Sequence, residues 1–157
     1  MPTKVKRPSS IIVGDFFTKN EKALKLRLVG SDIGFTRKIW EPSVNRPGLA
    51  LSGFFTYFAY KRIQTIGNSE LSFLEGLEPK VRAGRFSQLC SWEIPCLVVA
   101  RGHRLPEEMV AIANEAGISV FHTSMVTMKF LNAATIKLET AFAATMTVHG
   151  CMVDVQG

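Results

Sequence analysis

Apolar positions follow two spacings along this chain, and the spacings predict alternating strands and helices. Leu24, Leu26 and Leu28 alternate with two basic residues, which predicts a half-buried strand. The run Ile94–Ala100 is apolar throughout and bounded by turn residues, as is typical of a strand covered on both faces. Shorter strands are predicted over 37–40, 62–66 and 118–121.

The segment after Pro106 has the period of an amphipathic helix. Met109, Ile112 and Ala116 share one face, and Gly117 is a typical residue for ending the helix. This helix lies between two predicted strands, and that order implies a parallel pair joined by a right-handed crossover.

Further helices are predicted over 14–20, over 70–77 with Asn68 or Ser69 as the cap, and from Ser124 to about Ala143. Residues 45–47 predict a turn, 49–60 a helix or an aromatic-rich loop, and 145–155 a strand or hairpin. Together these elements predict an α/β fold, with a mostly parallel sheet of four or five strands flanked by helices.

Composition is that of a single domain without a membrane segment. The chain has 157 residues, 46% of them apolar, and no apolar run approaches the roughly 20 residues of a membrane span. Its three cysteines are odd in number and lack metal-ligand spacing. We therefore expect a cytoplasmic protein with reduced, packing cysteines, no metal site and no membrane partner.

The net charge of +6 is concentrated at the start of the chain, where residues 1–30 carry seven Lys or Arg against two acidic residues. Such a start is typical of a solvated tail and helix face, and it could also contact nucleic acid or an acidic protein. Because aromatic residues do not alternate with these charges, nucleic acid is not the expected partner.

Four segments carry a more particular signature. Residues 45–74 read NRPGLALSGFFTYFAYKRIQTIGNSELSFL, which joins an Asn-Arg-Pro-Gly turn, an aromatic run and an Ile-Gln-Thr-Ile-Gly strand end. Segments 94–102, 115–120 and 147–155 follow in order as IPCLVVARG, EAGISV and TVHGCMVDV. This collinear set resembles the HPr serine kinase/phosphorylase family, bacterial enzymes that phosphorylate a serine of the phosphocarrier protein HPr.

The resemblance covers roughly residues 13–157 and implies the amino-terminal domain of such an enzyme plus the first strand or two of its kinase domain. The phosphate-binding motif G-x-x-x-x-G-K-[ST] does not occur in the sequence. In the family it follows almost directly, so we expect a chain truncated just before that loop and inactive alone. ATP or pyrophosphate and magnesium are implied for the parent enzyme, and no cofactor is expected for this chain.

The resemblance also implies an outline similar to the Mur ligase amino-terminal domain. We accordingly divide the chain into a disordered tail over 1–10, the amino-terminal domain with its linker helix over 11–143, and the first kinase strands over 144–157. The implied role is assembly or regulation within a bifunctional, homo-hexameric enzyme that also dephosphorylates HPr by phosphorolysis. Its implied partners are copies of itself and, through the kinase domain, HPr.

Two other functions remain open. One is a free-standing ligand-sensing module without a kinase domain, and the other is a nucleic-acid-binding protein that uses the basic amino terminus. The coding sequence downstream of residue 157 distinguishes the first alternative from part of a kinase. Salt-dependent DNA binding tests the second.

His149 is the candidate catalytic residue, by resemblance only. The sequence alone favours a buried strand residue at this position, whereas the family places the histidine of Val-His-Gly in the kinase active site. His103 and His122 are expected to be loop and structural residues, although His122 stands at the carboxyl end of a strand, where α/β sheets place ligands.

Arg46 and Arg101 are the candidate anion or interface contacts. The alternative for Arg46 is a turn residue whose guanidinium binds backbone carbonyls. If the strands that carry the two arginines are neighbours, they would form a small basic cluster at one edge of the sheet, suited to a phosphate group or an acidic partner.

Overall fold

A five-stranded sheet runs through the centre of the computed structural model, which describes residues 5–6, 8–143 and 146–147. Its strands are β3 (Leu26–Val29), β5 (Val44–Asn45), β6 (Ile63–Ile66), β7 (Leu97–Val99) and β8 (Val120–Thr123). Their order across the sheet is β3-β8-β7-β6-β5, and every neighbouring pair is parallel except β3 and β8. The predicted α/β class, with a mostly parallel sheet of four or five strands, is therefore confirmed.

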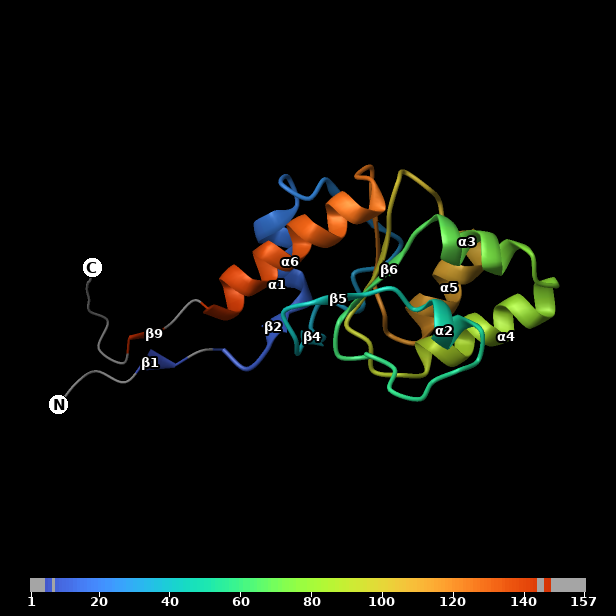
Figure 1. Ribbon diagram of the computed structural model, residues 1–157, viewed down its shortest axis with the longest axis horizontal. Coiled ribbons are helices and arrows are strands. Elements are labelled where there is room, and N and C mark those ends of the chain that lie inside the picture. The colour runs from blue at the N-terminus through green and yellow to red at the C-terminus, as the bar shows by residue number, and fades with distance from the viewer. Residues whose placement is uncertain (1–4, 7, 144–145, 148–157) are drawn as a thin grey trace.

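Helices cover both faces of this sheet (Figure 1). One face packs against α2 (Gly48–Leu51), α3 (Asn68–Glu75), α4 (Pro79–Cys90) and α5 (Glu107–Glu115). The other packs against α1 (Val13–Asn20) and α6 (Thr127–Ala143). Alternate residues of each strand enter opposite cores: Leu97 and Val99 face the α3–α5 side, whereas Val98 faces α6. This double coverage explains why Leu97–Val99 is apolar without alternation.

Most predicted elements lie where the spacing placed them. The helix predicted after Pro106 is α5, the strand predicted at 62–66 is β6, and the helix predicted over 14–20 is α1. The predicted parallel pair around α5 is β7 and β8. In the segment 49–60 the loop alternative is correct beyond the single turn of α2, because Gly53 and Tyr57 both adopt positive φ angles.

Two local expectations were wrong or incomplete. The predicted turn at 45–47 begins inside a strand, because Asn45 pairs with Gln64 as part of β5. The predicted cap of α3 was Asn68 or Ser69, but Gly67 precedes the helix and Glu70 accepts its N–H. Helix α4 runs without interruption from Pro79 to Cys90, through Gly84.

Arg37 connects the carboxyl end of α5 to the segment that precedes β7. Its guanidinium donates to the carbonyl oxygens of Gly117 at 2.7 Å, Ala116 at 2.8 Å and Ile94 at 2.9 Å. A cation at a helix carboxyl end satisfies carbonyls that the helix leaves unpaired. Arg37 is thus a structural arginine.

Two short antiparallel ribbons accompany the main sheet. Strand β2 (Ile11–Ile12) pairs with β4 (Lys38–Ile39), and β1 (Val5–Lys6) pairs with β9 (Met146–Thr147). None of the helices in the part of the chain that the structure describes is long and apolar enough to cross a bilayer.

Candidate functional site

The four parallel strands all end at one edge of the sheet, and the loops that follow them gather there. In open α/β sheets, ligands bind in the crevice outside these carboxyl ends. Arg46 follows β5, Gly67 follows β6, Arg101 follows β7 and Ser124 follows β8. We call this region the carboxyl edge.

Arg46 is held by a carboxylate. Its guanidinium donates to both oxygens of Glu70, at 2.9 and 3.1 Å, and the same carboxylate accepts the N–H of Gly67 at 2.8 Å. The Glu70 side chain is only 5% exposed, whereas that of Arg46 is 34% exposed. This bidentate pair offsets the cost of burying the carboxylate and connects β5 to the start of α3. The alternative that Arg46 binds backbone carbonyls is therefore wrong.

Gly67 permits a close approach of three elements beside this ion pair. A Cβ at this position would stand 2.8 Å from the Thr127 hydroxyl oxygen and 2.9 Å from a guanidinium nitrogen of Arg46. Thr127 begins α6 and is buried, and its hydroxyl has no hydrogen-bond partner among the described residues. Atoms fill the space around Gly67, so this part of the edge is packed protein.

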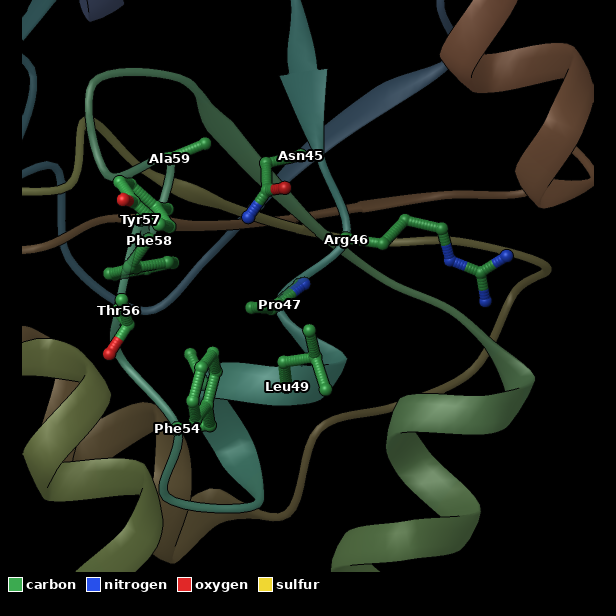
Figure 2. A pocket seen from close by; sticks show the side chains of 10 residues that line it. Asn45, Arg46, Pro47, Leu49, Phe54, Thr56, Tyr57, Phe58 and Ala59 are labelled. Carbon is green, nitrogen blue, oxygen red and sulfur yellow. The ribbon is translucent and has the colours of Figure 1, made fainter.

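A small hollow lies beside Arg46, between β5, α2 and the loop after α2 (Figure 2). It encloses about 110 Å³, and Phe54, Tyr57 and Phe58 are among the residues that line it. The guanidinium of Arg46 points away from these loop residues in Figure 2. Tyr57 is 99% exposed with a φ of 61°. The hollow is smaller than the roughly 300 Å³ typical of small-molecule sites, and Arg46, the one charged residue that lines it, is already paired with Glu70.

Arg101 lies in a tight turn after β7. Its φ is 61°, its N–H donates to the Met125 carbonyl oxygen at 2.8 Å, and its side chain is exposed. Strand β6 separates the two strands that carry Arg46 and Arg101, whereas the predicted cluster assumed neighbouring strands. Whether either arginine contacts an anion or another subunit stays a prediction.

His103 lies two residues further along this turn. Its ring forms a hydrogen bond with the side chain of Asn68, the first residue of α3. This contact joins the loops that follow β6 and β7.

A second, larger hollow lies at the other end of the carboxyl edge, where β3 and β8 meet the loop after β7. It is an open hollow of about 470 Å³. The residues that line it are Lys25, Leu26, Arg27, Gly102, Arg104, His122, Thr123 and Ser124. We call it the basic pocket, because every titratable side chain in this set is basic.

His122 is half-buried in the basic pocket. Its Nε2 accepts the N–H of Leu105 at 3.5 Å. Burial lowers the pKa of the His122 imidazole, and the charges of Arg104 and Arg27 lower it further. The neutral ring is thus favoured near pH 7, with the proton on Nδ1.

The remaining candidate groups have structural roles or lie outside the described residues. Burial raises the pKa of both the Cys90 and the Cys96 thiols to about 12, so neither is a nucleophile in the folded chain. Among residues 8–143, no three His, Cys, Asp or Glu side chains come together as metal ligands. His149 lies outside the described residues.

Sequence reasoning named His122 but missed its three basic neighbours. Lys25 and Arg27 were seen as the polar positions of an alternating strand and as part of the basic start of the chain, and Arg104 was not singled out. The signal that could have found Arg27 is strand register: it stands directly opposite His122 in the β3·β8 pair. That pairing is antiparallel and joins segments almost a hundred residues apart.

Comparisons with known proteins show which enzymes this chain is similar to. The chain is 38% identical over 137 residues to the HPr kinase/phosphorylase of Listeria welshimeri, a match that covers 87% of this chain and 44% of that protein. It is 39% identical over 153 residues to the HPr kinase/phosphorylase of Chlorobium phaeobacteroides, covering 96% of this chain and 48% of that one. The chain therefore spans about half the length of the curated relatives it matches.

A solved structure supports the fold. The CBS and DRTGG domains of the regulatory region of Clostridium perfringens pyrophosphatase, determined with the activator diadenosine tetraphosphate, superpose with a TM-score of 0.58. The match covers 90% of this chain and 55% of that one at 12% sequence identity, so the likeness concerns the fold alone.

The family model described as "HPr Serine kinase N terminus" matches residues 11–138, which include α1 to α5, most of α6 and the whole five-stranded sheet. The chain therefore belongs to the family of HPr serine kinase amino-terminal domains.

Proposed function

We propose that this chain is the non-catalytic assembly or regulatory unit of a bifunctional HPr(Ser) kinase/phosphorylase. The observation that carries the proposal is the family match over 11–138, combined with relatives about twice as long that are named HPr kinase/phosphorylase. The whole enzyme would phosphorylate a serine of HPr with ATP or pyrophosphate and magnesium, and would remove the phosphate by phosphorolysis.

The proposed division of labour is supported by the absence of a motif from the sequence. The sequence contains no G-x-x-x-x-G-K-[ST] loop, and within the described residues no group of three or more His, Cys, Asp or Glu side chains comes together as metal ligands. Catalysis would belong to the other half of the parent enzyme, to which His149 would contribute. The proposed boundaries are a tail over 1–10, this domain over 11–143 and kinase strands over 144–157, with a Mur-ligase-like outline and a cytoplasmic location.

Assembly with other copies is the partner proposal. Helix α6 covers one face of the sheet, yet Met128 and Ile136 on it are more than half exposed. Exposed apolar side chains on one helix are compatible with a subunit interface. Light scattering of M128K/I136K against the unmodified chain tests this, because a smaller assembly supports the proposal and an unchanged mass contradicts it.

The activity proposal is tested by complementation. The purified chain, mixed with HPr, ATP and magnesium, should leave HPr unphosphorylated. The same chain fused to the catalytic half of the Listeria welshimeri relative should phosphorylate HPr at a serine. Phosphorylation by the chain alone, or a folded fusion without any activity, would contradict the proposed function.

A ligand-sensing module is the second candidate function, and the basic pocket favours it. It differs from the first in needing a small-molecule ligand but no kinase domain. Nucleic-acid binding through the basic amino terminus has no comparable support, and a salt titration of DNA binding is its test.

A further inference from the structure

We propose that the basic pocket binds a small molecule that carries a phosphate group. The pocket lies between the start of β3, the end of β8 and the Arg101–Leu105 loop. Neither the family match nor the proposed kinase function assigns a ligand to this position.

The first argument is uncompensated charge. Lys25, Arg27 and Arg104 line one hollow, and no carboxylate lies within 4 Å of any of them among the described residues. The two ion pairs among the described residues, Arg46–Glu70 and Arg62–Glu41, involve none of these three side chains. Cations that converge on a concavity without a counter-charge create a local positive potential that attracts anions.

The second argument is the register of β3 and β8. Arg27 and His122 are direct cross-strand partners, so their side chains leave the sheet on the same face and close together. When a histidine placed opposite an arginine becomes protonated, the two like charges repel each other and the folded chain becomes less stable. A bound anion would remove this conflict, because it attracts both groups.

The third argument is shape. A hollow of about 470 Å³ lies within the roughly 300–1,000 Å³ of small-molecule sites, and it exceeds what a bare phosphate ion fills. Turns fix both of its walls: Lys25 has a φ of 52° and Gly102 a φ of 70°. The Lys25 and Gly102 amides donate to the carbonyls of Lys22 and Thr123, which holds the turns in place.

The chemistry selects phosphate among anions. Two guanidinium groups present planar donor forks that match the oxygens of a phosphate, and the lysine adds a point charge. Ser124 and His122 also line the pocket, and each side chain carries a group that can donate a hydrogen bond. Three permanent positive charges suit a dianion better than a single carboxylate.

The experiment follows the His122 ring by NMR while the whole chain is titrated with glycerol 3-phosphate at constant ionic strength. Glycerol is the matched ligand control. We expect a saturable shift of the His122 ring signals with the phosphate ester only. The pKa of His122 should rise on binding, because the dianion favours the protonated ring.

Charge variants locate the site. R104Q and R27Q should each weaken binding by roughly tenfold or more, since each loses a charge-assisted contact. K80Q removes the same charge from the exposed first turn of α4, outside the pocket, and should bind like the unmodified chain. Circular dichroism and thermal melting of each variant confirm that it is folded.

Two results would overturn the proposal. One is a response that never saturates or that K80Q weakens as much as R104Q does, which would indicate diffuse attraction to a basic surface. The other is stronger competition by single-stranded DNA than by the phosphate ester, which would make the pocket part of a nucleic-acid surface. Binding here is independent of HPr phosphorylation, so either hypothesis can fail while the other stands.

Discussion

The two ends of the carboxyl edge use arginine in opposite ways. At the Arg46 end, the fold supplies the counter-charge itself through Glu70, and the guanidinium connects a strand to a helix. At the basic pocket, Lys25, Arg27 and Arg104 face a hollow without a carboxylate among the described residues. A basic residue after a strand is therefore not in itself a ligand site. What separates the two ends is whether the protein has already neutralised the charge.

The largest effect should come from removing the neutralised cation. Arg46→Ala leaves Glu70 buried without its partner and should lower the free energy of unfolding by roughly 2–3 kcal/mol, with the partial exposure of Arg46 limiting the loss. Urea denaturation followed by circular dichroism measures it. Arg104→Ala is the matched control, with an expected change within about 0.5 kcal/mol. Equal losses in the two variants would remove the distinction drawn between the two ends.

The second-largest loss of stability should come from disturbing the packing at the Arg46 end. In Gly67→Ala the new methyl would meet Thr127 and Arg46 at less than 3 Å, so these side chains or the backbone must shift. We expect a loss of about 1–2 kcal/mol in the free energy of unfolding.

Gly84→Ala is the matched glycine control for that variant. Nothing lies within 4 Å of a Cβ at Gly84 in α4, so alanine there should stabilise the chain by about 0.5–1 kcal/mol. Thermal melting of both variants should therefore give shifts of opposite sign. A Gly67→Ala protein as stable as Gly84→Ala would show that the Arg46 end is not tightly packed.

A smaller effect should appear in the titration of His122. Arg104→Gln removes one of the charges that lower the pKa of this imidazole, so the pKa should rise toward its ordinary value of 6.5. The pKa is measured from the ring proton shifts in an NMR pH titration without ligand. Lys80→Gln should leave this pKa unchanged. If Arg104→Gln also left the pKa of His122 unchanged, the charges of the pocket would not act on the ring.

The smallest effect is the pH dependence of stability that His122 contributes. Its pKa is lower in the folded chain, so the unfolded chain binds its proton first as the pH falls below 6.5. This contribution is therefore complete above pH 6.5 and is lost as the pH falls through the folded pKa. The difference in unfolding free energy between the unmodified chain and His122→Gln should shrink over that window, and a difference independent of pH would contradict the lowered pKa.

The sequence predicted the sheet well because its signals are local. The apolar run containing Leu97–Val99 and the helical face of Met109 and Ala113 identify neighbouring elements whose parallel arrangement follows from chain order. The end strand β3 has no such constraint. It precedes the parallel strands in the chain, and its antiparallel pairing with β8 places Leu26 in the core that also contains Phe121 and residues of α6.

The sites were predicted less well for the same reason. Arg46 was noticed, but nothing in the spacing identified Glu70, in the helix predicted over 70–77, as its partner. The basic pocket needs the β3·β8 register to bring Arg27 beside His122, and it needs the turn after β7 to bring Arg104 to them. Spacing along the chain carries no information about such pairs.

The end strands of the sheet restrict how copies of this domain could join. Strand β5 has only two residues, and β3 is short and carries Arg27, with Lys25 just before it. Short, charged border strands discourage the addition of a foreign strand. Any oligomer built from this domain should therefore form through helices and loops, and its subunits should separate without unzipping a shared β-ladder.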